Sequence, residues 1–417
     1  MIHLNFKVSV IVIIAFFCIA SAKKCGTDSI FDSDCDTIYL ECSGLINKYF
    51  EKAATNPNTK SLHITHCNHL TDISALKSSY LKTLELYRLG SLINISPLMN
   101  LTTMESLSIG GISNNADLSI LYKLPRLNSL WLFDLPNLKS LNFLTTQKKL
   151  NALTIGLLDS TLDDYSIINS LSNLRELFII YPNINDYRIF KKLHNLKRLK
   201  ITQKDTLDLN GLEVLTALEE IDFEAFYLKN SYSTIQTLSK LKKIRIVNCL
   251  TAGFPNLDFI NEFKHIEKLI LEGITDTDTI RLSNLNIQKI YMSNMSKLKF
   301  LSLSNLPNLE HIMISDFDSL ATFRLNNVPN LKKLTIFNMQ SLESLPDLTN
   351  VPNLNILTIG NSEKIKIKDE NVQTLSKNDT LENNCSIDPE LMIKLKDRHC
   401  IIKEWNDSEI ANRNSLK

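Results

Sequence analysis

Leu81-Lys82-Thr83-Leu84-Glu85-Leu86 is the stretch that decides the fold of this chain. Its pattern is an apolar residue, two free positions, an apolar residue, one free position and a last apolar residue. The last two apolar residues form a dyad, and the pattern returns fourteen times, with the dyads Leu62/Ile64, Leu84/Leu86, Leu107/Ile109, Leu130/Leu132, Leu153/Ile155, Leu177/Ile179, Leu199/Ile201, Ile221/Phe223, Ile244/Ile246, Leu269/Leu271, Ile290/Met292, Ile312/Ile314, Leu334/Ile336 and Leu357/Ile359. Successive dyads start 21 to 25 residues apart. A fixed period of this size predicts one short unit stacked on copies of itself.

The alternation inside each copy predicts a short β-strand. Successive side chains of a strand point to opposite sides, so the dyad residues face the interior and the residues between and after them face outward. Each unit then buries its dyad against its neighbours, and we expect this solenoid to cover residues 61–365. A surface built in this way works through columns of outward side chains, so binding residues are sought there.

The repeated phrase resembles the signature of leucine-rich repeat proteins, which Leu331-Lys332-Lys333-Leu334-Thr335-Ile336 carries almost unmodified, over about 300 of the 417 residues. The resemblance implies an α/β solenoid, a right-handed horseshoe of about 14 repeats with a concave parallel β-sheet. Two stretches, 69–76 and 93–98, resemble the 22-residue class of bacterial internalins, and 339–348 resembles the irregular repeats of plant immune receptors. The family usually places Asn or Cys five residues after the first dyad member. That column is mostly apolar here, so we expect no regular asparagine ladder.

The segments that return from one strand to the next change along the chain. Residues 166–171, 187–193 and 233–238 have helix-like spacing and predict a turn or two of helix. Residues 303–309, 325–331 and 348–354 each contain a proline, which removes a backbone donor and restricts the residue before it. We expect these later connections to be extended.

The N-terminus has the pattern of a secretory signal. Lys7 supplies a positive charge, Val8 to Ile19 is apolar apart from Ser9, and Ala20-Ser21-Ala22 is a small-x-small cleavage site. The alternative, a membrane-spanning helix, needs about 20 apolar residues, and this run is shorter. We therefore expect residues 1–22 to be a signal peptide and the mature protein to be secreted, extracellular and monomeric, with no membrane span.

Seven cysteines follow the predicted cleavage site. Cys42 and Cys67 occupy nearly equivalent positions in adjacent coils, about 5 Å apart, which is disulfide range. We expect disulfides at the two ends of the solenoid, although the four N-terminal cysteines allow three connectivities, and the pairs are Cys25–Cys35, Cys42–Cys67 and Cys385–Cys400. They would staple an N-terminal cap, 23–60, and a C-terminal cap helix and tail, 366–417, in which 388–390 starts the helix. Cys249 is expected to be a buried free thiol.

Large apolar residues gather at outward positions of neighbouring copies. Trp131, Phe133, Phe178 and Ile180 are the members, with Tyr87 and Tyr181 at the margins. Exposed clusters of this kind mark partner sites, and aromatic residues are favoured hot spots. The alternative is that the side chains pack on each other across the sheet, or that the strand register slips by one residue.

A banded charge pattern lies beside this cluster. The basic Arg198 and Lys200 are followed one coil later by the acidic Asp222 and Glu224, and then by Arg245. Stacked strands bring these rows about 5 Å apart, so opposite signs meet laterally. They either neutralise each other as a surface ladder of little energetic value or orient a partner beside the aromatic anchors.

Polar motifs elsewhere are less specific. His63, His66, Cys67 and His69 crowd one heptapeptide, but no second ligand pair follows at zinc spacing, so we expect no metal and no cofactor. Six glycosylation sequons follow the signal, at Asn94, Asn100, Asn294, Asn378, Asn384 and Asn406. No motif of a hydrolase, a phosphate loop or a zinc helix is present, so we expect no enzyme. With 46 basic and 45 acidic residues and no basic stripe, we expect no nucleic-acid partner.

The sequence therefore predicts a secreted module that binds a protein partner through the concave face of a leucine-rich repeat solenoid. The partner would be a host protein, as for a secreted effector, or a molecule of the same organism. One alternative is an adaptor for a ubiquitin-ligase-type enzyme, with residues 25–60 as an F-box, although this segment is rich in cysteine and poor in leucine. An enzyme inhibitor or a structural coat protein is a further alternative.

Overall fold

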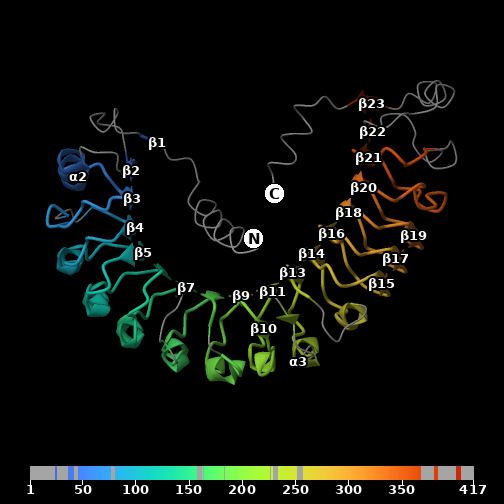
Figure 1. The fold of residues 1–417 in the computed structure, drawn as a ribbon. Helices are drawn as coiled ribbons and strands as arrows, with labels where there is room; N and C mark the ends of the chain where they lie inside the picture. Colours follow the sequence, from blue (N-terminus) through green and yellow to red (C-terminus); the bar gives the residue numbers. More distant parts are fainter. Residues whose placement is uncertain are drawn as a thin grey trace. The chain divides into compact units, whose positions relative to one another are not determined.

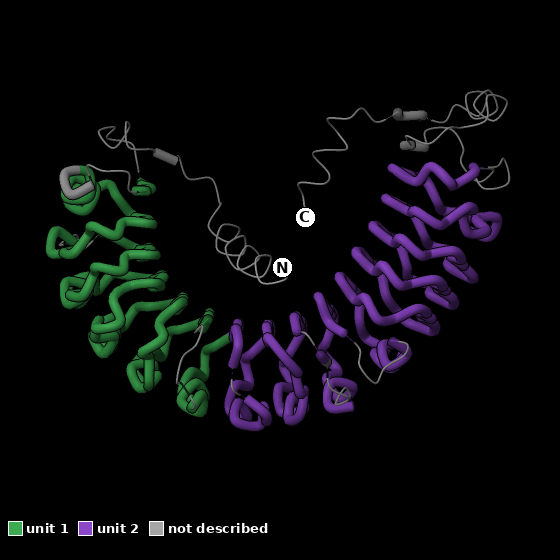
Figure 2. Tube along the Cα trace, in the orientation of Figure 1, with its two compact units in different colours: residues 1–174 green, residues 175–417 purple. Residues whose placement is uncertain are grey.

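A computed structural model describes residues 24–25, 36–41, 46–76, 80–156, 162, 164–182, 184–225, 227–228, 233–250, 257–367, 380–383 and 401–404. The predicted signal peptide, 1–22, lies outside these residues. The chain forms two compact units, unit 1 with residues 1–174 and unit 2 with residues 175–417 (Figure 2). In each unit, the parallel strands line one side of the coils and the returning segments lie on the other (Figure 1).

Unit 1 is a parallel sheet in chain order with short helices on its return side. Its strands are β1 (Lys24–Cys25), β2 (Thr37–Glu41), β3 (Ser61–Thr65), β4 (Thr83–Leu89), β5 (Ser106–Ile112), β6 (Ser129–Phe133) and β7 (Ala152–Gly156). Its helices are α2 (Ile46–Thr55) and the 3-10 turns η1 (Ser96–Asn100), η2 (Leu118–Lys123), η3 (Asn142–Thr146) and η4 (Ser166–Ser170).

Unit 2 continues the same plan with more varied returns. Its main sheet holds β8 (Glu176–Ile180), β9 (Arg198–Thr202), β11 (Glu220–Glu224), β13 (Lys243–Val247), β14 (Lys268–Glu272), β16 (Lys289–Ser293), β18 (His311–Phe317), β20 (Lys333–Met339), β21 (Ile356–Gly360), β22 (Thr380–Asn383) and β23 (Ile401–Glu404). The returns hold η5 (Tyr187–Phe190), β10 (Thr206–Leu207), η6 (Leu212–Val214), β12 (Tyr227–Leu228), α3 (Ser233–Gln236), η7 (Asp258–Glu262), β15 (Thr279–Ser283), β17 (Phe300–Ser304) and β19 (Thr322–Asn326).

The predicted register is confirmed within both units, because each dyad aligns with the next. Leu84 pairs with Leu107 in unit 1, and Ile290 pairs with Ile312 in unit 2. The fourteen dyads are buried, with relative exposures of 0 to 2%. Full burial of one such side chain stabilises the fold by about 1.5–3 kcal/mol, so the repeated phrase supplies the core.

The returns differ between helical and extended forms as the sequence predicted. The helix-like segments form η4, η5 and α3. Two of the three proline-containing connections begin in β17 and β19, which pair in parallel with β15 to make a second, three-stranded sheet on the return side of unit 2. This back sheet has its own inward dyads, Ile280/Leu282, Leu301/Leu303 and Phe323/Leu325, all buried. The sequence analysis predicted extended backbone here but not a sheet.

The residue that follows each strand takes a left-handed conformation in many coils. Among the described residues, seven of the twelve non-glycine positions with positive φ are asparagines, the residue type that tolerates this conformation best after glycine. Their amides form short ladders. Asn327 donates to Asn305 and Asn305 to Asn284 beside the back sheet, at 3.0 and 3.3 Å. Asn361 donates to Asn338 beside the main sheet.

These short ladders were not predicted, because their asparagines stand four residues after the first dyad member. The expectation of no regular asparagine ladder concerned the column five residues after it. That later column is packed inside, as Ile274, Met295 and Phe317 show, each with a relative exposure of 0%. The turn therefore uses one asparagine and one apolar residue in succession.

The predicted caps are described only in part. Ile38 and Leu40 of β2 are buried and pair with the first dyad, as expected of a capping strand. Within 366–417, for which a cap helix and tail were expected, β22 and β23 extend the ladder, while the helix expected from residue 388 lies outside the described residues. Cys67 is disulfide-bonded. Cys35, Cys42, Cys385, Cys400 and the side chain of Cys25 lie outside the description, so the three pairings stay predictions.

Candidate functional site

The strand face, meaning the outward side of each main sheet, carries three columns of side chains. They belong to the first, third and fifth residues of each strand, which alternate with the buried dyad. The third and fifth positions are those singled out from the sequence. Of the first positions, only Arg198 was named as a candidate from the sequence.

In unit 1, three of the predicted anchors lie together on the strand face. The rings of Trp131 and Phe133 meet edge to face, with centroids 6.4 Å apart. Tyr87 lies two strands away and contacts Arg88 through a cation–π arrangement at 5.4 Å. Trp131 is half-buried, whereas Phe133 is only 7% exposed. Phe133 is thus a packing residue, whereas Trp131 and Tyr87 are both half-buried and can be reached by a partner.

Glycine makes this packing possible. Gly110 aligns with Tyr87 on one side and with Phe133 on the other. A Cβ at Gly110 would lie 2.9 Å from the Phe133 Cβ, closer than such atoms approach, and 3.1 Å from the Tyr87 Cδ2, a contact tighter than most. The two aromatic side chains therefore flank the glycine, and together with Trp131 they form what we call the aromatic shelf: Tyr87, Phe133 and Trp131.

The other predicted anchors, Phe178, Ile180 and Tyr181, belong to unit 2. Phe178 is half-buried at the centre of β8, and Ile180 is only 8% exposed. Tyr181 has a φ of 56°, a strained conformation for an aromatic residue. Burial and the nearby Glu224 raise the pKa of Tyr181, and the Lys204 ammonium lies 4.8 Å from its ring. These contacts hold the ring in place.

The predicted charged residues pair with each other on unit 2. Arg245 donates to Asp222 at 3.1 Å and to Glu272 at 3.2 Å. Burial opposes its charge, but the two carboxylates outweigh it and hold the pKa of Arg245 above the ordinary value. Lys200 lies 3.8 Å from Asp222, and Arg198 pairs with Glu176.

These ion pairs form a self-neutralising ladder, one of the two interpretations of the charge pattern in the sequence. Lys200 and Glu224 are only 9% and 6% exposed, although both were expected to face solvent. Lys200 lies 3.8 Å from Asp222, and the Asn248 amide donates to Glu224 at 3.5 Å. An orienting role for these residues therefore stays a prediction, with Arg245 and Asp222 more accessible than Lys200 and Glu224.

A row of basic residues on unit 2 was missed by the sequence analysis. Lys268, Lys289, His311 and Lys333 occupy the first positions of β14, β16, β18 and β20 and are aligned strand by strand. Among the described residues, no carboxylate lies within ion-pair distance of the three lysines. Burial and the neighbouring Lys243 and Lys289 lower the pKa of Lys268. We call Lys268, Lys289, His311 and Lys333 the basic row; inspecting the residue before each dyad would have found it.

A Ser–His–Glu network on unit 1 was also missed. The His63 Nε2 lies 2.9 Å from the Ser61 Oγ, and its Nδ1 lies 2.7 Å from the Glu85 Oε2. His63 was expected to face solvent, but it is 5% exposed and stacks on Tyr39 with ring centroids 4.4 Å apart.

The network resembles a hydrolytic triad only in its hydrogen bonds. A triad needs backbone N–H groups free to hold an oxyanion near the nucleophile. The N–H groups of Lys60 and Ser61 both donate to the Asp36 carbonyl, and those of Lys82 and Thr83 both donate to the Lys60 carbonyl. The network therefore joins β3 to β4. The four backbone N–H groups of Lys60, Ser61, Lys82 and Thr83 are already used in the sheet and are not free to hold an oxyanion.

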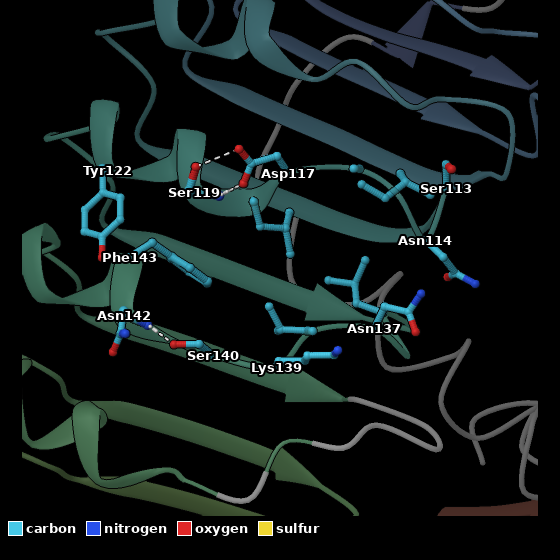
Figure 3. Close-up of a pocket in the computed structure, with 15 residues that line it drawn as sticks. Ser113, Asn114, Asp117, Ser119, Tyr122, Asn137, Lys139, Ser140, Asn142 and Phe143 are labelled. Carbon is cyan, nitrogen blue, oxygen red and sulfur yellow. Dashed lines mark hydrogen bonds between the residues drawn. The ribbon is translucent and has the colours of Figure 1, made fainter.

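A cavity of about 320 Å³ opens on unit 1 between the returns that hold η2 and η3 (Figure 3). Its walls include the apolar Leu118, Leu138 and Phe143. The polar groups are used to shape turns: the Asp117 carboxylate accepts from the Ser119 N–H at 2.9 Å, and the Ser140 hydroxyl accepts from the Asn142 N–H. Hydrogen bonding to Ser119 lowers the pKa of Asp117. The Asp117 carboxylate and the Ser140 hydroxyl are thus engaged within their own turns.

The structure also bears on the predicted free thiol, Cys249, on metal-binding groups and on membrane-spanning helices. Cys249 is a buried free thiol as predicted, and burial raises its pKa to about 12. In the part of the chain that is described, no group of three His, Cys, Asp or Glu side chains is placed to hold a metal ion. No helix within the described residues is long and apolar enough to cross a membrane.

The sequons are described at three positions. Asn94, Asn100 and Asn294 are exposed, and glycosylation there stays a prediction. Asn378, Asn384 and Asn406 lie outside the described residues.

Comparison with known proteins shows the fold. A leucine-rich repeat protein from Leptospira interrogans is similar at 17% identity, with 92% of this chain and 100% of that chain covered and a TM-score of 0.50. The TLR13–ssRNA13 complex is similar at 16% identity, with 89% and 62% covered and a TM-score of 0.53. An internalin from Listeria monocytogenes is similar at 19% identity over 86% and 89%, with a TM-score of 0.42.

Sequence comparison adds no closer relative. No family model matches the chain, and no curated protein matches it. Identities below 20% bear on the fold and not on the function. With the aligned dyads and the parallel sheets, the chain has the leucine-rich repeat fold.

Proposed function

We propose that this chain is a secreted recognition protein that binds a protein partner through its strand face. The observation that carries the proposal is the aromatic shelf of unit 1, where Trp131 stays half-buried with its ring edge to face against the buried Phe133. Aromatic anchors supported from below by rigid neighbours are the usual hot spots of protein interfaces. The sheet beneath is rigid, so binding loses little conformational entropy.

Small neighbours leave the Trp131 ring accessible. Ser108 and Thr154 occupy the aligned third positions of β5 and β7. Neither side chain is large enough to cover an indole ring, whereas Phe133 supports that ring from the side at 6.4 Å. A partner that covers Trp131 would therefore remove a large apolar surface from water without moving the sheet.

The test is partner capture by the full-length chain and its Trp131→Ala variant. A hot-spot tryptophan contributes about 2 kcal/mol or more, so the variant should bind about 30-fold more weakly. Tyr122→Ala is the matched control, because Tyr122 is an exposed aromatic residue of the same unit on the return side. Equal binding of all three proteins, with unchanged circular dichroism, would show that the shelf is not the site.

Secretion is the second part of the proposal. The disulfide at Cys67 supports it, because disulfides persist in oxidising compartments. The test is expression of the full-length chain in a secretory cell line. We expect protein in the medium that begins at Lys23 and shifts in mobility when reduced. Retention in the cytosol with free thiols would favour the adaptor alternative.

A further inference from the structure

The basic row carries positive charge that the described residues do not neutralise: none of them places a carboxylate within ion-pair distance of its three lysines, and His311 has only Glu310, at 3.9 Å. From β8 to β13 the first-position column alternates in sign, with Glu176, Arg198, Glu220 and Lys243 in succession. Lys243 pairs with Glu220 at 2.9 Å. After β13 the alternation stops, and the next four positions are all basic.

Nearby carboxylates are occupied elsewhere. Glu267 pairs with Lys242 at 3.2 Å, Glu272 pairs with Arg245 at 3.2 Å, and Glu310 pairs with Lys332 at 2.8 Å. Glu310 also lies 3.9 Å from the His311 ring. The row thus keeps a net positive charge at close spacing, since adjacent strands are about 4.8 Å apart. Like charges directly opposite each other destabilise a sheet, so the basic row lowers the folding stability of the chain.

Apolar side chains border the row on the third-position column. Ile270, Tyr291 and Met313 are aligned on β14, β16 and β18. Met313 is 43% exposed, and the Lys268 ammonium lies 4.9 Å from the Tyr291 ring. Cations beside an exposed methionine and a tyrosine suit a ligand that carries both negative charge and apolar groups.

We propose that the basic row, together with Ile270, Tyr291 and Met313, binds an extended acidic segment of a partner protein. The proposal names the partner's chemistry and rests on the proposed protein-binding function. The row spans three strand intervals, about 14 Å, which an extended chain covers with about four or five residues. A segment with acidic and apolar residues in alternation would place its carboxylates on the row and its apolar side chains on Ile270, Tyr291 and Met313. Nucleic acid fits less well, because single strands need several stacking rings and the column offers one.

The experiment measures fluorescence polarisation of a labelled heptapeptide in which Glu alternates with Leu, titrated with the full-length chain. The double variant Lys289→Gln/Lys333→Gln should bind about 10-fold more weakly or worse, since two ion pairs are lost. Lys243→Gln is the matched control, because its ammonium belongs to the same column but pairs with Glu220. We expect less than a twofold change for this control and a loss of peptide binding as salt rises.

Two results would overturn the inference. One is equal affinity of the heptapeptide for the wild type and the double variant, or equal affinity of a peptide with Gln in place of Glu. The other is tighter binding of an RNA oligonucleotide or heparin than of the peptide, with loss in the same double variant, which would assign the row to polyanions. Circular dichroism of the double variant checks that it is folded, which we expect because removing like charges favours folding.

His311 supplies an independent readout. Its ring faces Lys289, Lys332, Lys333 and Glu310, and burial together with Lys289 lowers its pKa. A bound carboxylate favours the protonated ring, so peptide affinity should rise as the pH falls from 7.5 to about 5.5, where glutamate is still ionised. His311→Gln should remove this rise.

The heptapeptide assay and the partner-capture assay can fail independently of each other. The heptapeptide assay does not involve Trp131, and the partner-capture assay does not vary the basic row. A chain that binds the peptide but captures its partner equally well with Trp131→Ala would lose only the shelf as its anchor. If the chain captures a partner through Trp131 but does not bind the peptide, only the assignment of the basic row to an acidic segment is contradicted.

Discussion

The first half of unit 2, β8 to β13, and the second half, β14 to β21, share one interior and differ on both surfaces. Their dyads are equally buried and aligned. In the first half the returns hold short helices and the first-position column alternates in sign. In the second half the returns form the back sheet, and the column becomes the basic row. Both changes begin at β14.

This difference teaches that the repeated phrase restrains only the buried positions. A dyad residue must fill space against two neighbouring coils. The outward positions and the returns have no such requirement, so they can be charged, apolar, helical or extended without disturbing the stack. Binding residues are therefore expected at the outward positions and in the returns, which the repeat does not restrain.

Breaking the paired half should have the largest effect on stability. Arg245→Ala leaves the half-buried Asp222 and Glu272 without their shared partner, so we expect a loss of about 1–2 kcal/mol in the free energy of unfolding. Urea denaturation measures it. Lys289→Gln in the basic row is the matched comparison and should cost nothing; an equal loss in both variants would show that the two halves do not differ.

The back sheet can be tested through its asparagine ladder. Asn305 has a φ of 52° and hydrogen bonds to Asn284 and Asn327. Asn305→Ala should cost about 1 kcal/mol, because alanine is strained in this conformation. Asn305→Gly keeps the conformation, so it should recover part of the loss in thermal melts. No difference between the two variants would argue against the left-handed turn.

Extending the alternation into the second half should stabilise the chain. Lys268→Glu places a carboxylate between Lys243 and Lys289, so we expect a gain of about 0.2–1 kcal/mol. The same change should weaken binding of the acidic heptapeptide. Lys268→Gln removes the repulsion between lysines without adding a carboxylate, so the difference in stability between the Gln and Glu variants measures the new attraction. A loss of stability with Glu would show that the row is not repulsive.

The smallest effect concerns pH. The folded chain holds the pKa of His311 below its ordinary value of 6.5, through burial and then Lys289. The unfolded state therefore binds the proton more readily, so this contribution to stability is present above pH 6.5 and is lost as the pH falls below it. Thermal melts should show a slightly steeper loss between pH 7 and 5.5 for the wild type than for His311→Gln. Parallel curves would contradict a lowered pKa.

The candidate sites were only partly readable from the sequence. Trp131 and Phe133 were found because outward positions follow directly from strand alternation. The unequal exposure of Trp131 and Phe133 was not predicted, because it depends on Gly110 and on the side chains that the neighbouring strands present. The charged ladder was predicted as a pattern, yet the burial of Lys200 and Glu224 emerged only from packing. The basic row was missed because, apart from Arg198, the residue before each dyad was not read as an outward position.

The sequence by itself determined the repeat, the strand register, the buried dyads and the helical or extended character of the returns. These properties depend on period and residue type within one coil, which the chain carries locally. The tertiary structure alone decided the lateral partners: the pairing of Arg245 with Asp222 and Glu272, the contact of His63 with Tyr39 and Glu85, and the back sheet. Such contacts join residues about one repeat apart, so each depends on how two coils stack and not on the pattern within either one.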